Sequence, residues 1–218
     1  MVRARYGSDD YLVVTFSPRQ ALFDDDVLDA LSRLRSELGA LAGVEAVTSI
    51  LDVPLIRSPP IDIRNIANGV RYLDDEDVDR AMAREELVNS ELYRELIISA
   101  DARTTALRVD LKQDQNYLAL RATRNELRQT AFQRSLSADE AERLVAVSAE
   151  FDQASQALLG AEQATIRDVR SVLNNYRQMA TLHIGGVPMI VADSIDFIRH
   201  DLLVFGGAVI SFLIVILL

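Results

Sequence analysis

The stretch Thr104–Lys112 reads TTALRVDLK, and its alternation decides more of the fold than any other part of the sequence. Leu107, Val109 and Leu111 would face one side of an extended chain, while Arg108 between them would face the other. A period of two is typical of a β-strand with one buried face and one solvated face. The sequence therefore predicts a half-buried strand in the middle of the chain, and the flanking segments predict the rest of the sheet.

The first quarter of the chain predicts a strand, a helix and a second strand. The run Tyr11–Phe16 (YLVVTF) is rich in β-branched and aromatic residues, and the SPRQ after it predicts a loop. The acidic run Asp24–Asp26 favours a helix start, and Gly43 lies where a glycine commonly closes a helix. The next run, VEAVTSIL at Val44–Leu51, predicts the second strand. Between them one apolar stripe has helical spacing: Val27, Leu31, Leu34, Leu38 and Leu41.

A proline-rich segment and a helix are expected before the central strand. The segment 52–63, DVPLIRSPPIDI, contains three prolines, so it cannot be a regular helix or a central strand and is expected to form an extended loop. Asp74 or Asp75 is expected to cap a helix that includes Met82–Ile98. The residues expected on the buried side of that helix are Leu87, Leu92 and Leu96.

Two long helices are expected after the central strand, as an antiparallel hairpin at about 117–179. The first ends near Gln133, and Ser137 with Glu140 forms a capping-box pattern that starts the second. Helices of this length usually pair with each other. Their heptad pattern is more typical of internal packing than of a docking surface: Leu144, Phe151, Leu158, Thr165 and Val172 recur every seven residues, with Val147, Ala154 and Ala161 in the alternate seam.

The C-terminal part predicts a short strand at Thr181–Ile184, a turn at Gly185–Pro188 and a final helix from Met189. That helix enters the uncharged run Leu202–Leu218, LLVFGGAVISFLIVILL. Such a run is typical of a transmembrane helix, although at about 1.5 Å per residue it covers roughly 25 Å of a hydrocarbon core of roughly 30 Å. The sequence thus predicts a helix at 188–218 that leads into the start of a membrane span.

Two explanations of this tail stay open on the residues alone. The chain is either a piece of a larger membrane protein, cut inside its next span, or a complete tail-anchored protein. The run YLVVTF is too short for the apolar region of a signal peptide, and Asp9 and Asp10 precede it. A domain outside the cytoplasm would then need a segment upstream of Met1, which favours the first explanation.

In chain order, the strands and main helices run β-α-β twice, with the hairpin in the second half. The simplest fold with this order is an α+β, split β-α-β sandwich of ferredoxin type. The sequence therefore predicts one such domain over 1–187, with the helical hairpin inserted in it, followed by the C-terminal helix.

Composition and charge exclude several classes of function. The chain has 33 acidic and 23 basic residues, a formal net charge of −10, and no dense basic cluster. Nucleic-acid binding is therefore disfavoured, as is adhesion of residues 1–187 to an anionic membrane surface. The absence of cysteine excludes disulfides and thiolate metal sites.

No catalytic, cofactor or metal constellation is visible in the sequence. His183 and His200 are the only histidines, and their spacing matches no transition-metal signature. The acidic runs at 24–26 and 74–77 lie at expected helix starts, where their charge already has a structural reason. Gly185-Gly186 lacks the lysine of a phosphate-binding loop, and no serine stands in a nucleophile-elbow context. The expectation is a protein that is not an enzyme, with no catalytic, cofactor-binding or metal residues.

Three segments together carry a resemblance to a known family. ARYGSDDYLVVTFSP at Ala4–Pro18, TTALRVDLKQDQNY at Thr104–Tyr117 and TLHIGGVPMIVADSIDFIRHDLLVFG at Thr181–Gly206 resemble the RND superfamily. They are most similar to its predicted-exporter branch, which is related to MMPL and hopanoid-transporter proteins. The two end segments are the specific ones, because the helical middle is generic.

The resemblance implies the first periplasmic porter domain of a proton-driven exporter of lipids or other hydrophobic compounds, with the start of transmembrane helix two attached. It implies a bacterial inner-membrane location with most of the chain periplasmic. The implied partners are the bilayer, the other domains of the same transporter and a hydrophobic cargo. The alternative from another class is a tail-anchored protein whose helical hairpin is a protein-interaction module.

Overall fold

The computed structural model describes residues 11–56, 71–75 and 78–217, and within them the chain alternates strands and helices. The proline-rich loop expected at 52–63 lies mostly outside the described residues. The elements, in chain order, are β1 (Tyr11–Pro18), α1 (Asp25–Gly39), β2 (Val44–Thr48), α2 (Arg80–Asn89), β3 (Thr105–Leu111), α3 (Gln115–Gln133), α4 (Ala138–Tyr176), β4 (Ala180–Gly185) and α5 (Val187–Leu217).

The described strands form one antiparallel sheet in the order β2-β3-β1-β4. In the register, Val14 of β1 lies opposite Leu107 of β3 and Ile184 of β4. The alternation predicted for the central strand is confirmed, because Leu107 and Val109 are fully buried while Arg108 on the opposite face is exposed. The mixed α+β class is therefore confirmed.

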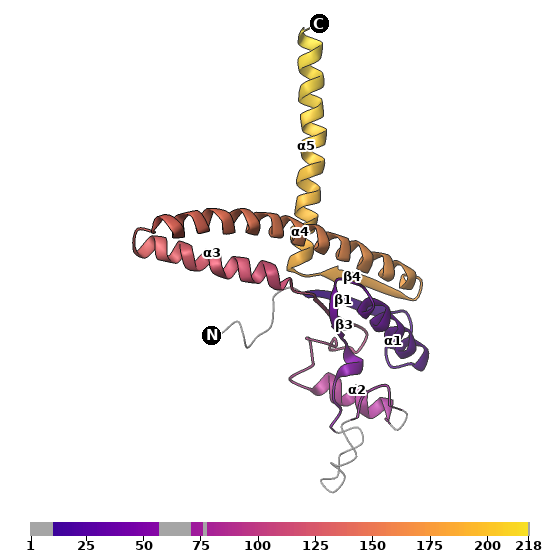
Figure 1. The fold of residues 1–218 in the computed structure, drawn as a ribbon. Helices are drawn as coiled ribbons and strands as arrows, with labels where there is room; N and C mark the ends of the chain where they lie inside the picture. The colour runs from indigo at the N-terminus through magenta and orange to yellow at the C-terminus, as the bar shows by residue number, and fades with distance from the viewer. Residues whose placement is uncertain (1–10, 57–70, 76–77, 218) are drawn as a thin grey trace.

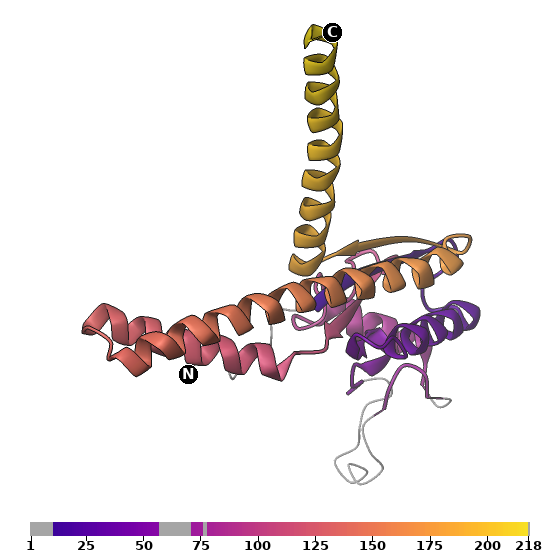
Figure 2. The ribbon, with the colours of Figure 1, turned by 45° about the horizontal axis from the view of Figure 1, so that its top comes forward.

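The core lies between one face of this sheet and two helices, α1 and the C-terminal half of α4 (Figure 2). The predicted stripe of α1 is confirmed: Val27, Leu31, Leu34 and Leu38 are buried, and Leu41 packs against the core. The other contributions come from Leu12, Val14 and Phe16 of β1 and from Ile166, Val169, Leu173 and Tyr176 of α4. The other sheet face carries exposed or half-buried residues such as Thr15, Arg108 and His183.

The helix expected over Met82–Ile98 is wrong in its second half. α2 ends at Asn89, because Ser90 has extended backbone angles, and Glu95 has a φ of +64° that a helix does not allow. Leu87 is buried as predicted, but Leu92 and Leu96 are 72% and 73% exposed. The N-cap is also a different residue from the two expected, since Asp79 accepts the backbone N–H groups at the start of α2.

Two further boundaries differ because a local contact ends the element early. α1 ends at Gly39, so Gly43 does not close the helix and lies in the turn before β2. β2 ends at Thr48, because Ser49 caps a single 3₁₀ turn at Ile50–Asp52 through the backbone N–H of Leu51. The strand predicted to continue to Leu51 is therefore shorter.

The predicted helical hairpin is confirmed. α3 and α4 lie side by side and extend well past the sheet (Figure 1). The capping box is present, because Ser137 accepts the backbone N–H of Glu140 and the Glu140 carboxylate accepts the backbone N–H of Ser137. α4 ends at Tyr176 rather than at Met179, because the chain turns there to enter β4.

α5 begins directly after the predicted Gly-rich turn. Gly186 has a φ of +130°, and a Cβ at this position would stand 2.6 Å from the Tyr11 carbonyl oxygen, so only glycine fits. Pro188 is buried in the first turn of the helix, which starts two residues before the predicted Met189. α5 points away from both the sheet and the hairpin (Figure 1).

The prediction that the C-terminal helix leads into a transmembrane span is wrong. In the part of the chain that the structure describes, no helix has the length and apolarity needed to cross a membrane. The physical reason is the composition of α5, whose first half contains Asp193, Asp196, Arg199 and Asp201. The uncharged remainder, from Leu202 to Leu217, covers only about 24 Å at about 1.5 Å per residue, against roughly 30 Å of hydrocarbon. The expectation of an inner-membrane location with a periplasmic domain depended on that span and is wrong with it.

Candidate interaction surface

The two halves of α4 differ in what they pack against. The C-terminal half of α4 is fixed to the domain through Ile166, Val169 and Leu173, which are buried against the sheet and α1. The N-terminal half packs on α3, and α3 has no fully buried residue among its 19. This outer half is therefore an extension with two neighbouring helices and little core of its own.

The hairpin tip is held by a charge-assisted contact across the turn between α3 and α4. Arg134 donates two hydrogen bonds to the Glu140 carboxylate, at 2.8 Å and 2.6 Å. These bonds, together with the backbone N–H of Ser137, lower the pKa of Glu140 to about 2. The same contact raises the pKa of Arg134 above its ordinary value. A bidentate pair of this kind adds a geometrically specific contact at the turn where the two helices meet.

Two large apolar side chains are exposed next to this fixed tip. Phe132 in the last turn of α3 is 94% exposed, and Val145 in the second turn of α4 is 72% exposed. A phenylalanine left almost wholly in water forgoes about 2 kcal/mol of burial free energy. Because single exposed apolar residues are ordinary on proteins, it is their position on a rigid projection that makes the tip a candidate contact surface.

The base of the hairpin is braced by stacked aromatic and guanidinium groups. Tyr117 and Phe151 lie with ring centroids 5.1 Å apart, and the Arg124 guanidinium carbon is 3.4 Å from the Phe151 centroid. Arg121 lies 5.8 Å from the Tyr117 ring on the same helix. Such contacts are worth about 0.5–2 kcal/mol each, and they hold the two helices of the hairpin together at its base.

The predicted heptad residues differ in how deeply they are buried. Phe151 and Thr165 are buried, while Leu144, Leu158 and Val172 are half-buried, as internal packing requires. In the alternate seam Val147 and Ala154 are half-buried, but Ala161 is exposed. The tip residues Phe132 and Val145 lie outside the heptad pattern. Sequence reasoning missed them because an apolar residue has the same signature whether it is buried or exposed.

The inner end of α4 is fixed to α1 by one polar contact. The Tyr176 hydroxyl donates to a Glu37 carboxylate oxygen at 2.8 Å, between residues 139 positions apart. Burial, followed by the hydrogen bond to Glu37, raises the pKa of Tyr176 to about 12. This contact joins the helix that carries the hairpin to the other helix of the core.

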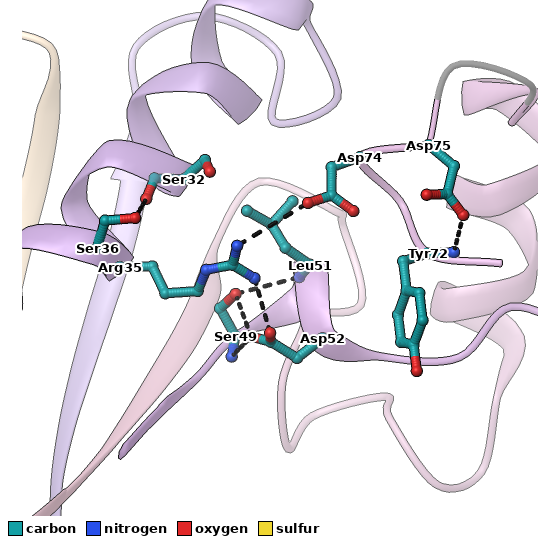
Figure 3. A network of polar contacts seen from close by, with 9 residues as sticks. All are labelled: Ser32, Arg35, Ser36, Ser49, Leu51, Asp52, Tyr72, Asp74 and Asp75. Carbon is teal, nitrogen blue, oxygen red and sulfur yellow. Dashed lines mark hydrogen bonds and ion pairs between the residues drawn. The ribbon is translucent and has the colours of Figure 1, made fainter. Parts of the chain in front are cut away.

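The acidic residues predicted at helix starts take part in a structural network rather than a catalytic one. Figure 3 shows Arg35 of α1 directed at Asp52 and Asp74, with N–O distances of 2.7 Å and 3.9 Å. Asp75 accepts the backbone N–H of Tyr72 at 2.8 Å, and Asp52 also accepts from Ser49. The network links α1 to two loop segments. Glu76 and Asp77 lie outside the described residues.

The remaining sequence candidates are not brought together. His183 is exposed on β4, and His200 lies far along α5. Among the described residues, no three His, Cys, Asp or Glu side chains are grouped as a metal site would need. A surface cavity of about 410 Å³ lies between α4 and the turn after α1, lined in part by Lys112, Asp114 and Leu158. Its lining is partly open to solvent and combines apolar with charged side chains.

Comparison with known proteins gives no relative from which a role could be transferred. No protein-family model matches the chain, and no curated protein matches it. The resemblance to RND-type exporters therefore stays a prediction.

Proposed function

We propose that this chain is a non-enzymatic interaction domain, in which an α+β body holds a rigid helical hairpin and the hairpin tip docks on a partner protein. The observation that carries the proposal is the 94% exposure of Phe132 in the last turn of α3, together with the 72% exposure of Val145 in the second turn of α4, both in the projecting part of the hairpin. Aromatic side chains on rigid elements are the usual anchors of protein interfaces, because little side-chain entropy is lost when they bind.

Several features support this role rather than an internal structural one. The tip is fixed by the Arg134–Glu140 contact and the base by Arg124 on Phe151, so the exposed residues are presented in one geometry. A partner that buried both tip side chains would gain about 3–5 kcal/mol before the costs of association. The apolar surface of α5 adds a second place where other protein elements can pack.

The test is a comparison of captured proteins with matched tip and control variants. The tip variant is Phe132→Glu with Val145→Glu, and the control is Ala122→Glu with Gln156→Glu, which adds two acidic groups at exposed positions nearer the base of the hairpin. A specific partner should be retained by the parent and the control and lost by at least tenfold from the tip variant. If the tip variant and the control variant captured the partner equally well, the tip would not be part of the interface. Charges at Phe151 and Leu158 would be a poor test, because Phe151 is buried against Tyr117 and Leu158 is half-buried beside the domain.

We also infer that the fold is a split β-α-β sandwich of ferredoxin type. The support is the strand order β2-β3-β1-β4 in one antiparallel sheet, with α1 crossing from β1 to β2 and α4 crossing from β3 to β4. A solved structure of the domain would test it through the side of the sheet on which both crossing helices lie.

A second candidate function is the one that the resemblance implies, a porter-type domain of an RND-type exporter that works by moving against neighbouring domains. The observation that favours it is the arrangement of the segments that carry the resemblance, because β1 and β4 pair side by side and the Gly185–Gly186 turn leads from β4 directly into α5. It is proposed without the membrane span and the membrane location that were expected with it. A native reading frame that encodes no second domain of this type would count against it.

A further inference from the structure

β4 lies at an edge of the sheet, and its outward backbone groups can be assigned from the register. Among the strands that the structure describes, β4 pairs only with β1, and the backbone N–H of Arg19 donates to the Met179 carbonyl at 3.0 Å just before β4 begins. In an antiparallel ladder the bonded pairs alternate, so Thr181 and His183 direct their backbone groups at β1. Ala180, Leu182 and Ile184 therefore direct their N–H and C=O groups away from the sheet.

The two edges of the sheet differ in how they are protected. β2 has a shift of register between Val44 and Ala46, and the exposed Glu45 lies within it. Bulges and charges of this kind discourage pairing with another strand. β4, with the sequence ATLHIG, has six residues in regular register and contains no proline, lysine or acidic residue. Of the two edges, β4 is the one that remains suited to pairing.

A groove runs along this edge and is lined mainly by β4. It has a volume of about 370 Å³ and is lined by Arg177, the run 180–184 and Met189, which belong to β4 and its two flanks. Nothing else in the described part of the chain lines it from the opposite side. The groove is therefore an open strand edge rather than an internal cleft.

We propose that the occupant of this edge is β4 of a second copy of the chain, paired antiparallel about Leu182, which would join two four-stranded sheets into one of eight strands. In this register Leu182 lies opposite Leu182 of the partner chain, and Ala180 lies opposite Ile184 of the partner chain. Each residue whose backbone N–H and C=O groups point away from the sheet therefore faces another such residue. On the core side the facing side chains are all aliphatic. On the other side Thr181 lies opposite His183 of the partner chain, polar against polar.

Charge also favours a second copy at this edge and disfavours it elsewhere. The chain has a net charge of −10, so two copies repel each other over most of their surface. β4 contains no charged residue, so the pairing places no like charges opposite each other. The two-fold arrangement is self-complementary, as a symmetric dimer requires. The inference is independent of the proposed role of the hairpin tip.

The test uses cross-linking between two single-cysteine variants of the full chain, which has no native cysteine. In the proposed register Thr181 and His183 of the partner form a non-bonded antiparallel pair with Cα atoms about 4.5 Å apart, which suits a disulfide. Thr181→Cys and His183→Cys, mixed and oxidised, should form a linked heterodimer in several-fold excess over either variant alone. Both side chains are exposed, so the substitutions leave the core intact.

A third variant separates this pairing from association through α5 or other surfaces. Thr48→Cys places an exposed thiol on β2, the opposite edge of the sheet, and should not link with His183→Cys. The parent chain should also have the mass of a dimer in light scattering, and Thr181→Glu with His183→Glu should shift it to the monomer. A monomeric parent, or equal linking in all mixtures, would overturn the proposal.

Discussion

Gly43 and Thr165 approach each other so closely that a Cβ built at position 43 would stand 1.9 Å from the Thr165 hydroxyl oxygen. The contact joins the turn before β2 to the point on α4 where the buried half of the helix begins. The glycine therefore fixes how deeply α4 lies on the domain. Its role is the space it leaves, since the backbone here does not need a left-handed conformation.

Gly43→Ala is expected to destabilise the domain, because the added methyl group forces α4 away from the turn. Overpacking of this kind costs about 1–3 kcal/mol. Urea unfolding followed by circular dichroism would measure it. Gly160→Ala is the matched control on α4, since a Cβ there meets nothing within 4 Å, and it should be neutral or stabilising by up to about 1 kcal/mol. Equal stability of the parent and Gly43→Ala would show that the contact is not a tight one.

Loss of the capping box is expected to fray the tip of the hairpin. Ser137→Ala removes the acceptor for the Glu140 backbone N–H and should cost about 1 kcal/mol of helix stability at that end. Amide hydrogen exchange at 138–141 should rise, while exchange at 166–173 in the buried half should not change. Ser155→Ala, in the middle of the same helix, is the control without a cap.

The tip is also expected to loosen in acid. The pKa of Glu140 is about 2 in the folded chain, below its ordinary value of 4.5, so its charged form is the one stabilised by folding. This contribution is complete above about pH 4.5 and is lost as the pH falls toward about 2. Protection from exchange at the start of α4, measured against the unstructured peptide at each pH, should therefore fall over that interval in the parent and change less in Glu140→Gln. A parallel response in both proteins would assign the change to other carboxylates.

At high pH the contact between Tyr176 and Glu37 is expected to limit stability. The pKa of Tyr176 is raised to about 12, so the neutral phenol is favoured by folding. The stabilisation is present below about pH 10 and is lost as the pH rises through about 12. Ultraviolet titration should show one tyrosine that ionises late, and Tyr176→Phe should remove it. That variant should also lose about 1 kcal/mol through the missing hydrogen bond.

The brace at the hairpin base gives a test of the cation–π contact. Arg124→Gln should lower stability by about 1 kcal/mol, because the guanidinium lies against the Phe151 ring. Arg128→Gln is the control, since Arg128 is exposed on the same helix. The difference should largely vanish when Phe151→Leu is present in both proteins, as a double-mutant cycle would show.

The sequence was most informative where a pattern repeats over several residues. The alternation at 104–112, the stripe of α1 and the hairpin with its Ser137–Glu140 cap were all predicted from spacing. The early end of α2 was not, because Leu92 and Leu96 have the spacing of a buried helical face and yet are exposed in turns. Spacing shows which residues could share a face, but not whether tertiary contacts hold the backbone in a helix there.

The candidate surface was predictable only in outline. The hairpin was expected, but its heptad residues turned out to hold it together, and the exposed pair at the tip carries no periodic signal. The contact between Gly43 and Thr165 joins residues 122 positions apart by their numbers and could not be read from local pattern. The final apolar run was read as a membrane span from hydropathy, and the acidic residues in the first half of α5 decide against it.

α4 is one continuous helix of 39 residues, roughly 58 Å long, with the exposed tip at one end and the start of β4 three residues beyond the other. The contact between Gly43 and Thr165 lies between these ends, where the projecting part of the helix meets the part packed on the domain. A force applied at the tip is therefore transmitted to the domain through the buried side chains Ile166, Val169 and Leu173. A load at the tip and the position of β4 are therefore mechanically linked through the single helix α4.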